Sequence, residues 1–172
     1  MIKSITLIAD DYPTKGHMEY VFVQQLVHAI IHMGIKVTIV APQSIVHHIV
    51  RRKRPLPKFS RETTEKGIAY DVYRPYKLSF GNRDFFSCIT RFFNKRVITS
   101  LIKKIDSDIL YAHFWHNTLP VYEYAIKREK CLFVACGEGD NALENLANSM
   151  SGDHKKRLAS SVTGVISVST EN

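Results

Sequence analysis

The chain has 172 residues, a length that supports one compact domain and leaves little room for a second. Apolar residues make up 45% and charged residues 23%, which is typical of a soluble folded domain and excludes a disordered chain. Its 24 Lys and Arg residues against 16 Asp and Glu residues give a net charge of +8, which favours anionic partners such as phosphorylated metabolites, acidic lipid or nucleic acid.

The first forty residues predict one β-α-β unit. Residues 5–9 form a short apolar run that ends in the turn-forming sequence DDYP, a pattern typical of a buried strand. Apolar positions repeat with helical spacing over residues 19–33, and Gly34 is the expected helix stop. Residues 35–41 predict a second strand ended by Pro42, parallel to the first and reached by a right-handed crossover.

The segment 42–66 carries a basic cluster followed by Pro-Leu-Pro and has no long periodic run, so we expect an exposed irregular excursion there. Strands and helices alternate again after it. The expected strands are residues 67–75, 108–115, 131–136 and 164–168, and the expected helices are residues 84–105, 119–127 and 142–160.

This alternation predicts a three-layer α/β/α, Rossmann-like fold with an open, mostly parallel sheet of about six strands. Ligands of such sheets bind in the crevice at the carboxyl ends of the strands. We therefore look for the site in the loops over residues 10–17, from 42 onward, 113–118 and 136–140.

The first of these loops leads into a helix N-terminus, where free backbone N–H groups and the helix dipole attract phosphate or carboxylate. Gly16 would let a ligand approach the backbone, and Lys15 and His17 beside it are candidate contacts. The loop has neither the dinucleotide G-x-G-x-x-G fingerprint nor a Walker A sequence, so a plain turn remains the alternative.

Two further loops carry candidate ligand contacts. His113 and His116 end the fourth expected strand, and their alternative role is to anchor the loop by hydrogen bonds. Gly137 and Glu138 follow the fifth expected strand and offer bare backbone amides beside a carboxylate. An ordinary glycine turn is the alternative there.

No metal site is indicated. Asp10 and Asp11 resemble the acidic pair that binds magnesium in receiver domains, but the further Asp and Lys of that arrangement are missing. His28 and His32 have the spacing of a zinc-protease helix without the Glu between them, so we expect solvated surface histidines.

The three cysteines, Cys88, Cys131 and Cys136, are odd in number and show no C-x-x-C spacing. They predict neither a disulfide framework nor a zinc site and fit a reducing cytosol. No apolar run approaches the roughly 18 to 20 residues of a spanning helix, and no signal peptide is recognisable. Export and membrane spanning are therefore disfavoured.

Two basic segments suggest contact with an anionic membrane surface. The expected helix at residues 84–105 combines basic residues with an apolar face, which core packing explains equally well. That face consists of Phe85, Ile89, Phe92, Phe93, Val97, Leu101 and Ile105. The candidate membrane contacts are Arg51, Arg52, Lys53, Arg54, Arg91, Lys95 and Arg96. Nucleic acid is not an expected partner, because no recognisable binding module is present.

Eight stretches share their order and spacing with a known family. They are residues 12–16, 22–26 (FVQQL), 34–42 (GIKVTIVAP), 55–57 (PLP), 67–68 (GI), 72–75 (VYRP), 108–114 (DILYAHF) and 165–169 (VISVS). In this order they resemble the N-terminal half of a family 4 glycosyltransferase, a large retaining group with the two-lobed GT-B architecture. The resemblance extends over nearly the whole chain.

The resemblance implies that residues 1–172 form the N-terminal, Rossmann-like lobe of a GT-B enzyme, the lobe that mainly holds the sugar acceptor. The second lobe of such enzymes grips the nucleotide sugar through basic residues and an E-x7-E pattern. No two Glu residues here lie eight positions apart, so we expect that C-terminal domain to be absent from this chain and the lobe to be inactive alone. No cofactor or metal is implied, because the nucleotide sugar is a substrate.

The implied activity is a metal-independent glycosyl transfer that elongates a cell-surface polysaccharide or lipid-linked glycan. His113, His116 and Glu138 would orient sugar hydroxyls, and the amides of the Gly16 loop would help to stabilise the leaving diphosphate. The expected partners are the acceptor, the C-terminal domain and an anionic membrane surface. The expected location is the cytoplasm, peripheral at the inner face of the plasma membrane.

Two departures from the family pattern leave the catalytic residue unassigned. Gly16-His17 stands where members often have Gly-Gly, and Cys136 stands where they often have a histidine. Gly137 and Glu138 would then supply more of the contacts to the bound sugar. The alternative from another class is a non-enzymatic Rossmann-like module that binds a phosphorylated metabolite or an anionic membrane.

Overall fold

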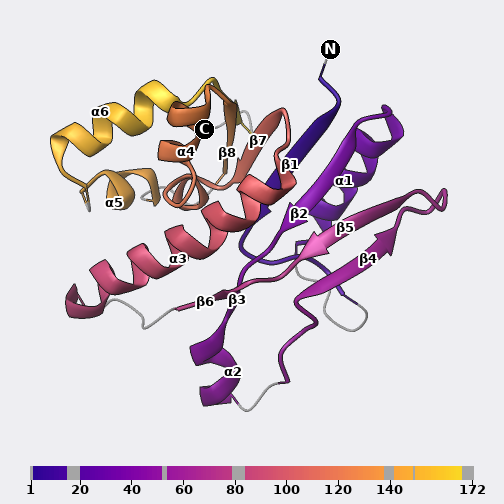
Figure 1. Cartoon of the computed structure of the whole chain (residues 1–172), viewed down its shortest axis with the longest axis horizontal. Coiled ribbons are helices and arrows are strands. Elements are labelled where there is room, and N and C mark those ends of the chain that lie inside the picture. Colours follow the sequence, from indigo (N-terminus) through magenta and orange to yellow (C-terminus); the bar gives the residue numbers. More distant parts are fainter. Residues whose placement is uncertain are drawn as a thin grey trace.

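The computed structural model describes residues 2–14, 20–51, 54–78, 84–137, 142–148 and 150–167. Helices and strands are interspersed along the chain (Figure 1). In chain order the elements are β1 (Ser4–Ala9), α1 (Val21–His32), β2 (Lys36–Val40), β3 (Gln43–Ser44), α2 (Ile45–Arg51), β4 (Phe59–Thr63), β5 (Ala69–Tyr73), β6 (Tyr76–Lys77), α3 (Asp84–Ile105), β7 (Ile109–His113), the 3-10 helix η1 (Trp115–Thr118), α4 (Tyr122–Arg128), β8 (Cys131–Cys136), α5 (Ala142–Asn148), α6 (Gly152–Ser161) and β9 (Gly164–Ser167).

A seven-stranded sheet forms the centre of the molecule, with the strand order β4-β5-β2-β1-β7-β8-β9. Its neighbouring strands pair in parallel, except that β4 is antiparallel to β5. Strands β3 and β6 form a separate two-stranded ladder. The prediction of an open, mostly parallel Rossmann-like sheet is confirmed, with one strand more in the main sheet than the six expected.

The segment 42–66 is not the irregular excursion that the sequence suggested, and that prediction is wrong. It contains β3, α2 and β4, and β4 pairs with β5 from Phe59 opposite Tyr73 to Thr63 opposite Ala69. Strand β4 lies at an edge of the sheet, and its residues FSRET are half-buried or exposed. An edge strand of this kind lacks the apolar pattern by which a buried strand is recognised.

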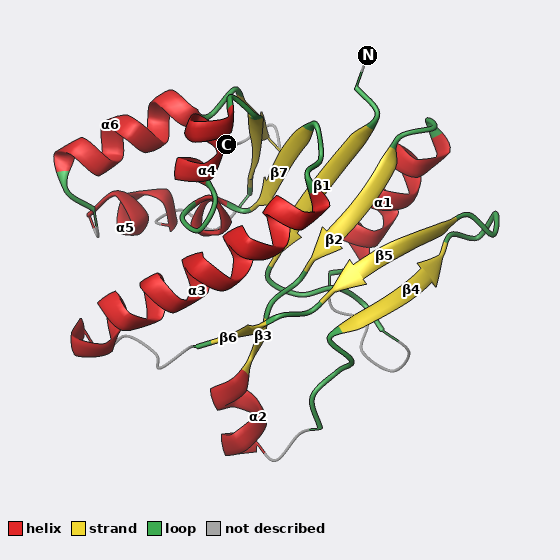
Figure 2. Cartoon of the chain, viewed as in Figure 1, coloured by secondary structure: helices red, strands yellow, loops and turns green. Residues whose placement is uncertain are grey.

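Two apolar cores lie on opposite faces of the sheet, because helices cover both. Ile8 and Leu110 belong to the core on which α3, α4, α5 and α6 pack. Leu7 and Tyr111 point to the other face, where Val27 of α1 contacts the same core. Figure 2 shows α3 to α6 on one side of the strands and α1 on the other, which gives the three-layer α/β/α arrangement.

Helix α3 has the expected bounds, but its apolar face is only partly the expected one. Ile98 and Ile102 are buried in the core, whereas Ile89, Phe92 and Phe93 are 57%, 66% and 37% exposed. The last turns of α3 pack on the sheet, while its N-terminal end extends away from the strands (Figure 2). Core packing therefore does not account for the aromatic stripe at residues 89–93.

The helical stretch expected at residues 142–160 consists of two helices, α5 and α6. Ser151 precedes α6 with extended backbone angles, φ −67° and ψ 158°, so the helix cannot run through this position. Both helices belong to the layer that covers β7 and β8, since Leu146 and Leu158 are buried in the same core.

Candidate functional site

The carboxyl ends of β1, β7 and β8 lie side by side at one edge of the sheet. In the register, Ala9 lies opposite His113, and Ala112 lies opposite Val134. The loops that follow these three strands therefore start from adjacent positions. Ligands of open α/β sheets bind at this edge, so it is the candidate functional site.

Three charged or ionisable side chains from separate segments meet at this edge. Asp10 follows β1 directly and accepts a hydrogen bond from Nε2 of His116 in η1. Its other carboxylate oxygen, Oδ1, lies 3.3 Å from Nζ of Lys77, the last residue of β6. Burial alone would raise the pKa of the Asp10 carboxyl, but the hydrogen bond from His116 and the charge of Lys77 together lower it by more, so the net shift is downward. Asp10 is therefore ionised at neutral pH.

The turn that carries His116 is held by two side-chain hydrogen bonds to the backbone of β7 and η1. Asn117 Nδ2 donates to the backbone oxygen of His113 at 2.6 Å, and Thr118 Oγ1 donates to the backbone oxygen of Trp115 at 2.6 Å. Asn117 and Thr118 are buried, whereas the His116 side chain is 44% exposed. The buried side chains of Asn117 and Thr118 thus hold the turn in place. The His116 imidazole, bound to the Asp10 carboxylate, lies at the surface.

His113 lies beneath this group and is itself buried. The residue is 1% exposed, and its ring lies 5.3 Å, 6.1 Å and 4.2 Å, between centroids, from those of Phe22, Tyr111 and Phe114. Desolvation lowers the pKa of His113 to about 4, so the imidazole is neutral at pH 7. The hydrogen bond from Asn117 reaches the backbone oxygen of His113, and Nδ1 of the ring is buried with no hydrogen-bond partner among the described residues, so packing of the aromatic rings holds the imidazole in place.

Gly137 follows β8 and is half-buried beside Cys136, whose thiol is free. β8 also pairs with β9, with Cys136 opposite Ser167, so the same edge continues to the end of β9. The other predicted ligand contacts, Lys15, Gly16, His17 and Glu138, lie outside the described residues.

Two residues of the site were missed in the sequence. Lys77 lies in a strand of only two residues, which is too short to leave a recognisable sequence pattern. Asp10 was considered only as part of a magnesium site. The usable signal for Asp10 was its place directly after a buried strand, the same signal that singled out His116.

The predicted membrane contacts are distributed over α2, the following loop and α3. Arg54, Arg91 and Arg96 are exposed, and Lys95 forms an ion pair with Glu123 of α4. Arg51 is the last residue of α2, and Arg52 and Lys53 lie outside the described residues. Within the described part of the chain, no helix combines the length and apolar character needed to cross a membrane.

In the part of the chain that the structure describes, no group of three or more His, Cys, Asp or Glu side chains is arranged to hold a metal ion. His28 and His32 are largely buried, so the expectation of solvated histidines is wrong. Their Nδ1 atoms lie 2.6 Å and 3.6 Å from the carboxylate of Glu65, and His28 Nε2 lies 3.2 Å from the hydroxyl of Tyr70. These contacts tie α1 to the turn between β4 and β5.

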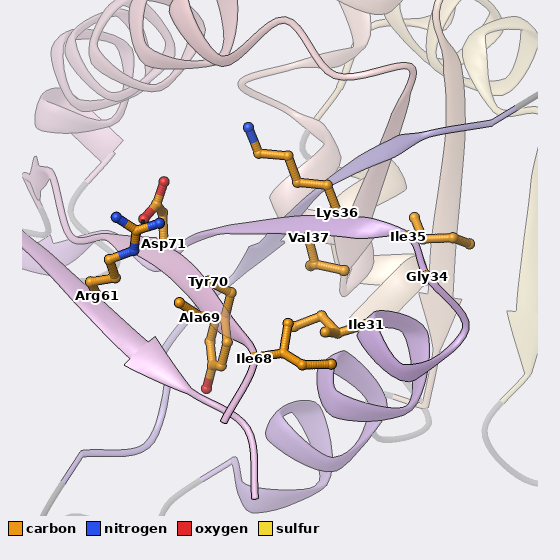
Figure 3. A pocket seen from close by; sticks show the side chains of 10 residues that line it. All are labelled: Ile31, Gly34, Ile35, Lys36, Val37, Arg61, Ile68, Ala69, Tyr70 and Asp71. Atoms are coloured by element: carbon orange, nitrogen blue, oxygen red, sulfur yellow. Dashed lines mark ion pairs between the residues drawn. The ribbon is translucent and has the colours of Figure 1, made fainter. Parts of the chain in front are cut away.

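A cavity of about 390 Å³ lies at the opposite edge of the sheet, where α1 ends and β2 and β5 begin (Figure 3). It is lined by Ile31, Gly34, Ile35, Lys36, Val37, Arg61, Ile68, Ala69, Tyr70 and Asp71. Figure 3 shows Ile31 and Ile68 side by side on its apolar wall. Because it is remote from Asp10 and from the carboxyl ends of the strands, its size does not make it the candidate site.

In comparisons with known proteins, this chain is similar to other proteins in structure and not in sequence. The sequence matches no family model, and no curated protein sequence is significantly similar to it. Solved structures do resemble it. A chain of sucrose-phosphate synthase from Thermosynechococcus elongatus aligns with 98% of this chain and 78% of its own length, at 12% identity and a TM-score of 0.56.

A longer chain of the same synthase aligns with 91% of this chain and 38% of its own length, at 11% identity and a TM-score of 0.51. A putative UDP-N-acetylglucosamine 2-epimerase from Listeria monocytogenes aligns with 99% of this chain and 40% of its own length, at 12% identity and a TM-score of 0.51. This chain thus spans less than half of these two longer chains. At such identities the likeness shows the fold alone, and this chain has a Rossmann-like α/β fold with an open, mostly parallel sheet.

Proposed function

We propose that this chain is the N-terminal, acceptor-binding lobe of a retaining, nucleotide-sugar-dependent glycosyltransferase of family 4. The observation that carries the proposal is the exposed Asp10–His116 pair at the carboxyl edge of a sheet with this fold. An imidazole held by an ionised carboxylate can exchange a proton or a hydrogen bond with a sugar hydroxyl. The order of the sequence motifs supports the choice of family.

In this role each side chain of the site has a separate task. Asp10 orients the imidazole of His116 and stabilises its protonated form, because its low pKa keeps the carboxylate charged. Lys77 holds the second oxygen of Asp10 and adds positive charge at the edge that faces the acceptor. The backbone oxygen of His113 holds η1 through Asn117, and Gly137 follows the neighbouring strand β8.

The partner of this lobe is a second, C-terminal domain that binds the nucleotide sugar and closes over the same edge. Positioning of the two substrates and electrostatic stabilisation of the leaving diphosphate then supply most of the rate, with no metal or cofactor. The acceptor is the growing end of a cell-surface polysaccharide or a lipid-linked glycan. Without the second domain the lobe binds acceptor and does not turn over.

The test of the transferase proposal uses the two-lobed enzyme and a panel of nucleotide sugars, with release of the nucleotide diphosphate as the readout. We expect His116→Gln to lower transfer by about 10²- to 10⁴-fold, the usual contribution of a positioned acid or base. Asp10→Asn should have a similar effect, because the amide can neither hold the tautomer nor stabilise the imidazolium.

The matched control for these variants is His154→Gln, since His154 is an exposed histidine on α6, away from the strand ends. It should transfer at the wild-type rate. Activity of His116→Gln equal to that of the control would remove His116 from the mechanism. Failure of the wild-type enzyme to hydrolyse or transfer any donor in the panel would leave a non-enzymatic binding module as the better description.

The proposal also places the lobe on an anionic membrane surface, through helix α3. Ile89, Phe92 and Phe93 recur on one exposed stripe of this helix, and Arg96 continues it one turn further on. Apolar side chains beside cations suit the boundary between acyl chains and anionic headgroups, and the net charge of +8 has the matching sign. A lipid-linked acceptor would then lie close to the catalytic edge.

Co-sedimentation with vesicles that contain anionic lipid tests this surface. Arg96→Gln should weaken partitioning about 5-fold, since one cation near a charged bilayer contributes on the order of 1 kcal/mol. Phe92→Ser should weaken it further by removing apolar contact. Lys155→Gln removes the same charge from α6 and should leave partitioning almost unchanged. Binding that is insensitive to salt, or equally affected by all three changes, contradicts a docking role for α3.

A further inference from the structure

Arg74, directly after β5, is a buried cation whose hydrogen-bonding capacity is only partly used. The residue is 2% exposed, and Nη1 donates to Oγ of Ser60 at 2.7 Å. Nε and Nη2 are also buried, and neither has a hydrogen-bond partner within the part of the chain that the structure describes. Among the described residues, no carboxylate forms an ion pair with the guanidinium and no aromatic ring stacks on it.

The two unpartnered atoms form one complete edge of the guanidinium. Nε–H and Nη2–H point in parallel from the same side of the planar group, so together they can donate two hydrogen bonds to a single carboxylate or phosphate. The opposite side is the one that Ser60 occupies through Nη1. Arg74 is thus held in orientation by Ser60, and its bidentate edge is buried without a hydrogen-bond partner among the described residues.

The protein groups near Arg74 do not satisfy this edge. The carboxylates of Glu62 and Asp11 and the hydroxyls of Tyr12 and Tyr70 are close enough to influence its charge electrostatically, without hydrogen bonding to it. Tyr12 donates its hydroxyl hydrogen to Tyr70 instead, at 2.9 Å. Removing a charged group from water without a partner is strongly unfavourable, so a buried unpaired guanidinium is a site that an anion completes.

We propose that Arg74 is the anchor of an oxyanion-binding site, which takes a phosphate group or a carboxylate of a small ligand. The anion accepts two hydrogen bonds from Nε and Nη2, while Ser60 holds Nη1. The site lies at the carboxyl end of β5, the edge that also carries Asp10. It is an inference about anion binding alone, and it holds whether or not the chain takes part in glycosyl transfer.

The position of the site makes it suited to the charged end of a ligand bound at the same edge. Strand β2 separates β5 from β1 in the sheet, and Ala41 N donates to Tyr73 O at 2.9 Å just before Arg74. Two strand spacings of about 4.8 Å put the end of β5 roughly 10 Å from the end of β1. A sugar or nucleoside phosphate is long enough to contact both places.

Nuclear magnetic resonance of the wild-type chain with 15N-labelled arginine tests the site directly. At constant ionic strength, we expect inorganic phosphate to shift the Nε–H signal of Arg74 in a saturable way, while chloride does not shift it. Acetate in a parallel titration distinguishes a planar carboxylate from a tetrahedral phosphate as the better occupant. No saturable shift with either oxyanion overturns the proposal.

Substitutions provide the second measurement, with phosphate-dependent thermal stabilisation as the readout. Arg74→Lys keeps the charge and loses the bidentate edge, so we expect its dissociation constant for phosphate to rise at least 10-fold. Arg61→Lys is the matched control, because Arg61 is exposed on β4 and has no role in the proposed site. This variant should bind phosphate with the wild-type dissociation constant. Equal loss in both variants would mean nonspecific binding and would overturn the proposal.

The nearest competing explanation is that Glu62 fills the edge in solution. If it does, Glu62→Gln will move the Nε–H signal of Arg74 in the absence of any added anion and will increase phosphate affinity. A large shift of the signal without added anion, together with loss of the saturable phosphate shift in the wild type, assigns the edge to an internal ion pair and overturns the proposal. A signal that stays close to its wild-type position without added anion, with the saturable phosphate shift retained, supports an external anion.

Discussion

Replacing Ile102 by Ala should lower the free energy of unfolding by about 3 kcal/mol, within the range of roughly 2 to 5 kcal/mol for buried isoleucines. Ile102 is completely buried where α3 packs on the sheet, against a core that includes Leu110 and Val121. The deletion removes apolar contact and leaves a cavity that a close-packed interior cannot fully close. Urea unfolding monitored by circular dichroism measures the change.

Ile89→Ala is the matched control for this prediction, since it deletes the same atoms from the same helix at an exposed position. Its effect should stay within about 0.5 kcal/mol, because surface substitutions away from special contacts are nearly neutral. A loss at position 89 as large as that at position 102 would show that the N-terminal end of α3 packs on the protein.

Acidification from pH 7.5 to pH 5 should cost the fold about 2 kcal/mol through His113 alone. The unfolded imidazole has a pKa of 6.5, whereas burial lowers the pKa in the folded state to about 4. The unfolded chain therefore binds the proton first, so stability falls as the pH drops below about 6.5 and levels off below about 4. Unfolding free energies from urea titrations at pH 7.5, 6.5, 5.5 and 5 measure this slope.

Asp10 does not change the free energy of unfolding appreciably between pH 7.5 and pH 5. Its pKa is lowered from 3.8, so its stabilising effect is complete above that value and is lost only as the pH falls through the lower, folded-state pKa. His113→Gln should reduce the slope by about the predicted amount, whereas His154→Gln should keep the wild-type slope. If His113→Gln does not fold, direct titration of the His113 ring by nuclear magnetic resonance decides. A pKa near 6.5 would contradict the prediction.

The buried parts of the fold were predictable because burial leaves a periodic trace in the sequence. The strands β1, β2, β7 and β8 read as short apolar runs, and α1 and α3 have helical spacing. The bounds of α3 and β8 agree with the expected ones to the residue. Strand β4 left no such trace, because one neighbour and a solvent-facing side impose no apolar pattern on its residues.

The candidate site was predictable as an edge and not as a set of contacts. The rule that ligands bind at the carboxyl ends of parallel strands singled out His113, His116 and Gly137 from the sequence. It could not distinguish the exposed His116 from the buried His113, because that difference depends on the rings packed around each imidazole.

By itself, the sequence determined the three-layer arrangement, the parallel sheet and the sheet edge that carries the candidate site, because alternation of apolar runs and turns is a local property. Only the tertiary structure decided that Lys77 meets Asp10, that the aromatic stripe of α3 faces outward, and that Arg74 is buried with two donors unpaired among the described residues. Each of these depends on atoms brought together from distant positions, and hydrogen bonds and burial depend on distance in space rather than along the chain.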